Sequence, residues 1–564
     1  MRDFLASRMR SNSNLPLPLT SSQVSSARAA PARRGWLTSV FSLNAPSLQP
    51  LVLLILGLNL LFWVALPSLL LTGPDADNME ELVWGNVFQW GYYKHPPLPS
   101  WVHFTLMSVF GRHMWITFFA AQLSVALALY FIWRLGCELT SQRNALLAVV
   151  LTMPIAYFTT RGVMSNHNTL QLWSVAGSIW MLYRAWRYQQ MRDWVLLGMF
   201  AGFATLTKYS IAVWYFIFIL HLALSGSLRD ARTWKGMLAG TALLVVMVMP
   251  HAMWLYHMKF VLHDPANPLD YAAGSTDMST MTRAENLLDM WYVLTTTLAR
   301  LAPMLLAMLV IGGLMHRARR KQIIPVDPLR NSIATHLRPE DRRFILLLAL
   351  APFVLTCVMS FIAGTRMIAD WTTTYFLMTG LLTFWLYREN SDQRLFKTAL
   401  VTVLVIQFLT AAGYAVGRGP LASLLGKPGR SNYPSHAVAR AMKNAWYSHT
   451  HAPLRFITAD TWLGGNIAIH TGRQAQVLIN GDLHDSPWVD PEQLKACGTL
   501  VAIDISPNAP DSVMPKVAAA MKEATMTGIV TLPATMDPNS PPIILEWGVV
   551  PPTGGCRRIP HTPH

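Results

Sequence analysis

The sequence predicts an α-helical polytopic membrane protein that ends in a C-terminal α/β domain. Of its 564 residues, 52% are apolar and only 13% are charged. That is too little charge to cover a soluble surface of this size. Long apolar runs alternate with short basic loops as far as about residue 416, and the composition then changes. These three observations define the fold class.

The first 46 residues are rich in Ser, Arg, Pro and Ala and contain no apolar stretch. Such a segment resembles neither a cleavable signal peptide nor a folded domain. We expect residues 1–46 to be a disordered cytoplasmic tail.

Residues 47–416 form the predicted transmembrane domain, whose first outer loop is 72–112. Each span should contain a run of apolar residues long enough to approach bilayer thickness. The candidate spans are 50–71, 113–134, 144–160, 168–186, 194–207, 210–226, 236–256, 290–315, 344–363, 371–387 and 397–415.

If the chain crosses the membrane at each of these spans in turn, the basic clusters all fall on one side. The positive-inside rule assigns that side to the cytoplasm. Those clusters are Arg28, Arg33 and Arg34; Arg134 and Arg143; Arg184, Arg187 and Arg192; Arg229, Arg232 and Lys235; Arg317, Arg319, Arg320 and Lys321; and Arg388, Arg394 and Lys397. The net charge of +16 therefore reflects orientation, and nucleic-acid binding is not expected. The apolar segment 98–110 is too short to span and would invert every later loop, so we predict a helix in the outer interface.

Residues 417–564 are predicted to fold as a periplasmic α/β domain. β-rich runs at 455–457, 476–479, 500–505, 529–532 and 543–547 accompany helical stretches at 435–446 and 514–524. An oxidising compartment would allow Cys497 and Cys556 to form a disulfide, and the alternative is two unpaired thiols. Cys137 is expected on the cytoplasmic side and Cys357 within a span, and no Cys or His spacing suggests zinc.

The densest group of ionisable residues lies in the first outer loop. Asp77 and Glu80 share a helix face, which suits a general base or a metal ligand, although acidic residues also favour any first helical turn. Lys94 is followed by His95 and two prolines that hold the chain extended. A lysine at this depth either binds a phosphate or reaches for lipid headgroups.

Further cations stand at the outer ends of spans, where the positive-inside rule predicts few. Arg161, Lys208 and Arg366 are the principal ones, and Asn166, His167, His251 and Asp370 lie near them in sequence. Several cations on this face suggest an anionic ligand at the interface. Asp264 and Asp270, in the outer loop 257–289, are either additions to this site or ordinary solvated residues.

The first-loop motif resembles that of bacterial GT-C glycosyltransferases, the group with the protein O-mannosyltransferases and the lipid A aminoarabinose transferases. The matching elements are Asp77-x-x-Glu80, Trp84-Gly85, GYYKHPPLPSW at 91–101, Leu206-Thr207-Lys208-Tyr209 and Asp370-Trp371, with 459–466, 480–482 and 486–490 in the C-terminal domain. The likeness touches most of the chain from residue 51 and is sharpest in the first loop.

This resemblance implies a GT-C-like fold of about 11 to 13 transmembrane helices in a bacterial inner membrane. The implied reaction moves a sugar from a polyprenyl-phosphate donor, of the undecaprenyl or decaprenyl type, to a periplasmic acceptor such as lipid A, another envelope glycan or a protein. Asp77 would act as base and Glu80 would orient it, while Lys94, with Arg366, Lys208 and Arg161, would hold the donor phosphate. His95, Glu81, His167 and Asp370 are further candidates. Because the leaving group is the carrier phosphate, no nucleotide motif or other cofactor is required.

The chain departs from the family pattern at two places. Where many members have Asp-Glu-Ala-Glu, it has Asp77-Asn78-Met79-Glu80 preceded by Asp75, so Asp75 or Asp77 can be the base. Asn166-His167-Asn168 stands where an acid is often found, which leaves any metal role open.

Three other functions stay open from the residues alone. A transporter or flippase would place charges near span centres and show an internal repeat, neither of which is evident. In a lipid-binding scaffold, the acidic loop would have no catalytic role and would be ordinary solvated surface. A ligase or polymerase for lipid-linked glycans would need the same charge placement as a single-sugar transferase.

Overall fold

The computed structural model describes residues 47–261, 281–320, 337–386, 393–507, 509 and 514–556. The predicted tail 1–46 and the outer-loop residues Asp264 and Asp270 lie outside these ranges. The part described after residue 46 forms one compact unit.

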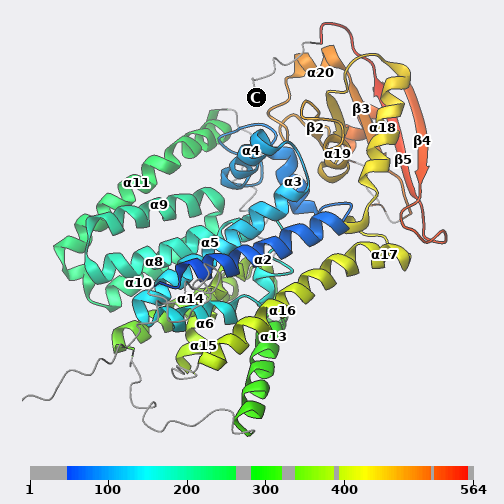
Figure 1. Cartoon of the computed structure of the whole chain (residues 1–564). Coiled ribbons are helices and arrows are strands. Elements are labelled where there is room, and N and C mark those ends of the chain that lie inside the picture. Colours follow the sequence, from blue (N-terminus) through cyan, green and yellow to red (C-terminus); the bar gives the residue numbers. More distant parts are fainter. Residues whose placement is uncertain are drawn as a thin grey trace, which may run out of the picture. The chain divides into compact units, whose positions relative to one another are not determined.

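Every predicted span corresponds to a helix in the described ranges (Figure 1). These helices are α2 (Gln49–Leu70), α5 (Trp115–Leu139), α6 (Gln142–Thr152), α8 (Leu172–Tyr188), α9 (Met191–Thr207), α10 (Ala212–Leu224), α11 (Ala231–Tyr256), α13 (Arg283–Arg320), α14 (Pro339–Ala363), α15 (Thr379–Leu386) and α16 (Gln393–Arg418). Six of the described helices are long and apolar enough to cross a membrane by length and composition. The segment predicted to lie in the interface is the separate 13-residue helix α4 (Leu98–Phe110).

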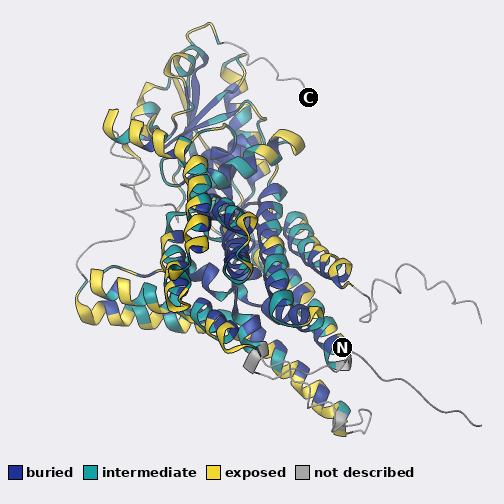
Figure 2. Ribbon diagram, turned by 90° about the vertical axis from the view of Figure 1, so that its left-hand side faces the viewer, coloured by how far each residue is buried: buried dark blue, intermediate teal, exposed yellow. Residues whose placement is uncertain are grey.

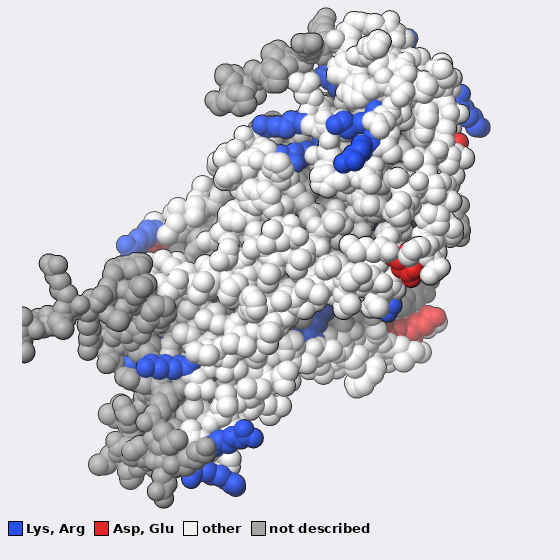
Figure 3. Space-filling model, turned by 45° about the vertical axis from the view of Figure 1, so that its right-hand side comes forward, with Lys and Arg blue, Asp and Glu red and all other residues white. Residues whose placement is uncertain are grey.

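The outer faces of several of these helices carry large exposed apolar side chains. Val246 and Met253 on α11, Leu309 on α13 and Ile362 on α14 are each more than 60% exposed. Figure 2 shows exposed residues along the helix exteriors, and most of the face in Figure 3 carries no charged side chain. Apolar surface of this extent requires lipid contact, so the chain is a multi-pass membrane protein.

The C-terminal residues fold into a five-stranded sheet with helices, as predicted. The strands β1 (Phe456–Ala459), β2 (Gln476–Ile479), β3 (Thr499–Asp504), β4 (Met526–Leu532) and β5 (Ile543–Val550) take the order β2-β1-β3-β5-β4. β2, β1 and β3 run parallel, while β5 and β4 are antiparallel additions. The helices are α17 (Pro420–Leu424), α18 (Ser435–His449), α19 (Thr461–Ala468), α20 (Pro491–Cys497) and α21 (Pro515–Glu523).

A disulfide joins Cys497, the last residue of α20, to Cys556 beyond β5. The sequence left open whether these two cysteines form a disulfide or remain unpaired thiols, and the structure contains the disulfide. The link closes a segment with a sequence separation of 59 and ties the chain end to the sheet. Cys137 and Cys357 are free.

The short helix α3 (Ala76–Trp84) shares one apolar core with this C-terminal domain. Met79, Leu82, Val83 and Trp84 are buried together with side chains of α18, α19 and the sheet. Helix α19 packs closely enough on α3 to require a glycine, because a Cβ at Gly465 would lie 2.4 Å from Met79 Sδ.

Arg112 adds a polar tie between the same two parts. It is buried, and it donates to the Leu82 carbonyl at 3.1 Å and to the Ala475 carbonyl at 2.9 Å. The domain is therefore a structural support for α3.

We expect Gly465→Val to displace α3, because its side chain overlaps Met79. Overpacking of this kind costs about 1–3 kcal/mol, so the melting temperature should fall. Gly413→Val on α16 is the matched control, since no atom lies within 4 Å of a Cβ built there. Equal effects of the two substitutions would contradict the proposed support.

Candidate active site

Helix α3 presents two carboxylates on one face and buries its other side. Asp77 and Glu80 are half-buried, whereas Asn78, Met79 and Glu81 are buried. Asp75 is the N-cap residue, with extended backbone and no capping hydrogen bond from its side chain. The shared face predicted for Asp77 and Glu80 is thus observed.

Asn78 fixes the orientation of α3. Its Nδ2 donates to Thr117 Oγ1 at 2.9 Å, and its Oδ1 accepts from the Ser165 backbone N–H at 3.0 Å. A carboxylate could not donate the first of these bonds. An amide at this position, where the family often has an acid, is therefore explained by the packing.

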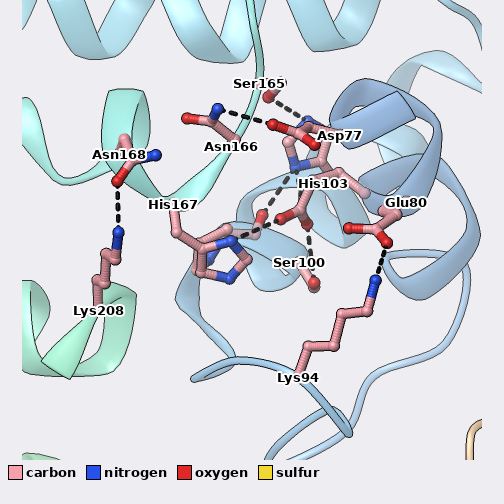
Figure 4. A network of polar contacts seen from close by, with 12 residues as sticks. Asp77, Glu80, Lys94, Ser100, His103, Ser165, Asn166, His167, Asn168 and Lys208 are labelled. Carbon is pink, nitrogen blue, oxygen red and sulfur yellow. Dashed lines mark hydrogen bonds and ion pairs between the residues drawn. The ribbon is translucent and has the colours of Figure 1, made fainter. Parts of the chain in front are cut away.

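The two aspartates have different partners. Asp77 Oδ2 accepts from Asn166 Nδ2 at 2.8 Å, and Asn166 is itself held as the N-cap of α7 (His167–Leu170) (Figure 4). Asp75 forms an ion pair with Arg418, with Oδ1 and Nη2 3.6 Å apart. Asp77 is therefore oriented by a neutral amide, and Asp75 is offset by a cation.

Glu80 and Lys94 bind each other directly, as Figure 4 shows. Burial raises the pKa of Glu80, while the Lys94 ammonium opposes that rise. The side chains keep 20% and 23% of their surface exposed, so both are accessible. The structure thus makes Lys94 the partner of Glu80, a pairing that sequence reasoning did not predict.

Lys208 follows the last residue of α9 and is half-buried. Its Nζ donates to Asn168 Oδ1 at 2.5 Å and lies 5.5 Å from the centre of the Trp371 ring. Burial lowers the pKa of Lys208 to about 8, although the Asp370 and Asp77 carboxylates act in the opposite direction. Lys208 is a half-buried cation that an amide, not a carboxylate, holds in place.

Asp370, in the 3₁₀ helix Ala369–Phe376, brings together two arginines. Arg161 binds it through two nitrogens, with Nε 3.1 Å from Oδ1, and Arg300 Nη1 lies 2.9 Å from the same oxygen. Sequence reasoning missed Arg300. The available signal was an arginine within the apolar run 290–315, because a charge inside a span usually indicates function.

The structure brings most of the predicted site residues into one charged cluster, with one exception. Arg161 interacts electrostatically with Asp75 and Asp77, and Lys94 and Lys208 both act on His95. Arg366, by contrast, is 63% exposed and pairs with Asp289 on α13 at 3.7 Å. We assign Arg366 no part in this cluster.

Behind the charged face lies a buried network around Glu81. Its Oε2 accepts from Ser100 Oγ at 2.8 Å, and His103 and His167 nitrogens stand 3.8 and 3.6 Å from its oxygens. Burial raises the pKa of Glu81 well above its usual value and lowers that of His103 to about 4. Burial thus disfavours a charge on Glu81 and on His103.

The His95 ring lies against the His167 ring, with ring centres 3.9 Å apart and ring planes tilted by 39°. Burial, helped by the nearby Lys208 and Lys94, lowers the pKa of His95 to about 3. Both rings are neutral near pH 7. Within the ranges that the structure describes, no group of three or more His, Cys, Asp or Glu side chains is arranged to hold a metal ion.

Three comparisons place the chain among known proteins. Residues 94–254 match the family described as dolichyl-phosphate-mannose-protein mannosyltransferase. The lipopolysaccharide core galacturonosyltransferase RgtA of Rhizobium johnstonii is 24% identical over 432 residues, which are 73% of this chain and 78% of RgtA. RgtB of the same organism is 24% identical over 221 residues, 37% of this chain and 42% of RgtB.

The solved structure of ArnT from Cupriavidus metallidurans bound to undecaprenyl phosphate has a similar fold. The TM-score is 0.57 over 89% of this chain and 98% of ArnT, at 12% identity. The fold and these matches together support a glycosyltransferase of the GT-C class. More particularly, they support the type that includes ArnT and the protein mannosyltransferases, as the first-loop motif predicted, and they favour an enzyme over a transporter or scaffold.

Glu81→Gln is expected to retain most activity, because the amide copies the protonated carboxyl that burial favours. Glu81→Ala should lower the free energy of unfolding by about 1–3 kcal/mol, since it leaves Ser100 unpaired. Thermal unfolding and transfer assays of both variants check this. A large loss of activity in a stable Glu81→Gln protein would instead indicate that Glu81 ionises during the reaction.

If a charged Lys208 is needed to bind an anion, kcat/KM should fall as the pH rises through about 8, where the free lysine loses its proton. Lys208→Arg keeps the charge at higher pH, so its profile should stay flat to about pH 10 even if its rate is lower. The pH dependence of kcat/KM for the two proteins is the measurement. An identical fall in both would assign the break to another group.

Proposed function

We propose that the protein transfers a sugar from a polyprenyl-phosphate donor to an envelope acceptor on the periplasmic face of the bacterial inner membrane. This proposal rests on which charged side chains of the site are already paired with each other and which are not. Among the described residues, no cation lies within ion-pair distance of Asp77 and no carboxylate lies within ion-pair distance of the half-buried Lys208, and the two groups interact electrostatically.

Asp77 is the proposed base. Asp75 is paired with Arg418 and Glu80 with Lys94, so a proton arriving at either carboxylate would disrupt an ion pair. Asp77 receives the proton of the acceptor hydroxyl while that oxygen bonds to the anomeric carbon. The bond between the anomeric carbon and the carrier phosphate breaks, and the phosphate leaves with the electron pair.

Lys208 is the proposed principal ligand of the carrier phosphate. The leaving phosphate gains negative charge in the transition state, and a fixed cation in a water-poor site stabilises that charge. Lys94 and Arg161 lie at the same cluster but already neutralise Glu80 and Asp370. They are therefore assigned supporting roles.

An apolar cavity of about 320 Å³ supports a lipid carrier. It lies between α8, α9, α10 and α11 and is lined on α9 by Trp194, Leu197, Gly198 and Ala201. The same helix ends beside Lys208. An isoprenoid tail has the apolar character that this cavity accommodates.

The acceptor is proposed from the relatives. RgtA and RgtB are named as lipopolysaccharide core galacturonosyltransferases, which favours a lipopolysaccharide acceptor. The disulfide between Cys497 and Cys556 is consistent with an oxidising compartment for the C-terminal domain. The amino terminus would then be cytoplasmic.

Asp77→Asn should reduce transfer by about 10²- to 10⁴-fold, the usual contribution of a positioned base. The amide preserves shape and can still contact Asn166, so folding should be unaffected. Transfer from a radiolabelled polyprenyl-phosphate sugar to lipopolysaccharide, with purified protein in nanodiscs, is the assay.

Asp75→Asn is the matched control and should lose less than tenfold, because Asp75 is already paired with Arg418. The reverse ranking would make Asp75 the base. Wild-type rates in both single variants and in the double variant would reject carboxylate-dependent transfer altogether.

A further inference from the structure

The C-terminal domain contributes a cation to the acidic face of α3. Arg430 begins a short 3₁₀ helix, Arg430–Asn432, which contacts the chain just before Asp75. The Thr72 backbone N–H donates to the Ser431 carbonyl at 3.0 Å, and a Cβ on Gly73 would lie 2.3 Å from the Arg430 carbonyl oxygen. The guanidinium interacts electrostatically with Glu80 and so opposes the rise that burial causes in the pKa of that carboxyl.

Arg430 differs from most other cations of the site in its partners. Lys94, Arg161, Arg300 and Arg418 each pair with a carboxylate. Among the described carboxylates, none lies within ion-pairing distance of Arg430, and its side chain is exposed. Among the described residues of the site, Lys208 and Arg430 are thus the two cations without a carboxylate partner. Each can bind an anionic group of a substrate.

One carrier phosphate accounts for one of these two cations. Lys208 lies half-buried at the end of α9 and suits that phosphate, as proposed above. Arg430 extends from the C-terminal domain and interacts electrostatically with Glu80 on α3, so it is placed to bind a second anionic group of the substrates.

The surroundings of Arg430 suit a sugar. Its guanidinium lies 5.9 Å from the Trp462 ring, and Tyr433 packs on the same ring with centroids 4.5 Å apart. Trp462 Nε1 donates to the Pro74 carbonyl at 3.3 Å, which fixes the indole beside the acidic run. A partly exposed aromatic ring packs against the apolar face of a sugar, while the planar fork of arginine binds a carboxylate through two hydrogen bonds.

We propose that Arg430 and Trp462 form a subsite for an acidic sugar, in which Arg430 binds the sugar carboxylate. The inference rests on the proposed function and adds the charge class of a substrate. The carboxylate belongs either to the donor sugar or to a sugar of the acceptor next to the reacting hydroxyl. In both cases the C-terminal domain determines specificity.

The test uses the full-length protein in nanodiscs with two pairs of substrates. The donors are polyprenyl-phosphate galacturonate and polyprenyl-phosphate galactose, which differ only in the carboxylate at C6. The acceptors are lipid-linked core oligosaccharides with and without an acidic sugar. Arg430→Gln should lower kcat/KM on the order of 10- to 100-fold for the charged member of one pair.

For the neutral member of that pair, the loss should be less than threefold. The pair that shows the difference identifies the source of the carboxylate. Arg430→Lys should recover part of the loss, because lysine keeps the positive charge but lacks the planar guanidinium that binds a carboxylate through two hydrogen bonds. Lys427→Gln, an exposed cation three residues earlier, is the control and should leave all four rates unchanged.

Equal losses on charged and neutral members of both pairs would overturn the inference while leaving glycosyl transfer intact. If the wild-type protein transfers neither donor, neither of these sugars is its donor, and binding of free galacturonate and galactose, measured by saturation-transfer NMR, decides the subsite separately. Preferential galacturonate binding that Arg430→Gln abolishes supports it, and no preference rejects it.

Discussion

The structure depends on how α3 is packed. This nine-residue helix places Met79, Leu82, Val83 and Trp84 in a core built largely by the C-terminal domain, while Asn78 ties it to α5 and to the loop before α7. An isolated helix of this length is not stable in water. The position of Asp77 and Glu80 therefore comes from packing on both sides, and the domain beyond the membrane helices is part of the site.

Burial then dictates the electrostatics. In a poorly solvated region charges need partners, and Lys94, Arg161, Arg300 and Arg418 find them in Glu80, Asp370 and Asp75. Where no charged partner exists, neutral amides hold the group, as Asn166 holds Asp77 and Asn168 holds Lys208. A site organised before substrate arrives loses little free energy in reorientation during the reaction.

Much of the fold could be predicted because its signals are local. Apolar run length gave the spans and the short interfacial helix α4, and alternating β-forming runs gave the five strands. Within the site, motif resemblance and unexpected outer cations brought forward Asp77, Glu80, Lys94, Arg161, Lys208 and Asp370. The same argument also selected Arg366, which pairs with Asp289 instead, because two cations near span ends look alike in sequence.

The sequence by itself determined the membrane class, the order of spans, the α/β domain and the chemical types gathered in the first outer loop. Only the tertiary structure decided which of those groups are already neutralised. It paired Glu80 with Lys94, buried Glu81 among neutral histidines, and added Arg300 and Arg430 from distant segments. The reason is physical: ion pairing and desolvation act over a few ångströms in space, and residues 80 and 430 become neighbours only when the chain folds.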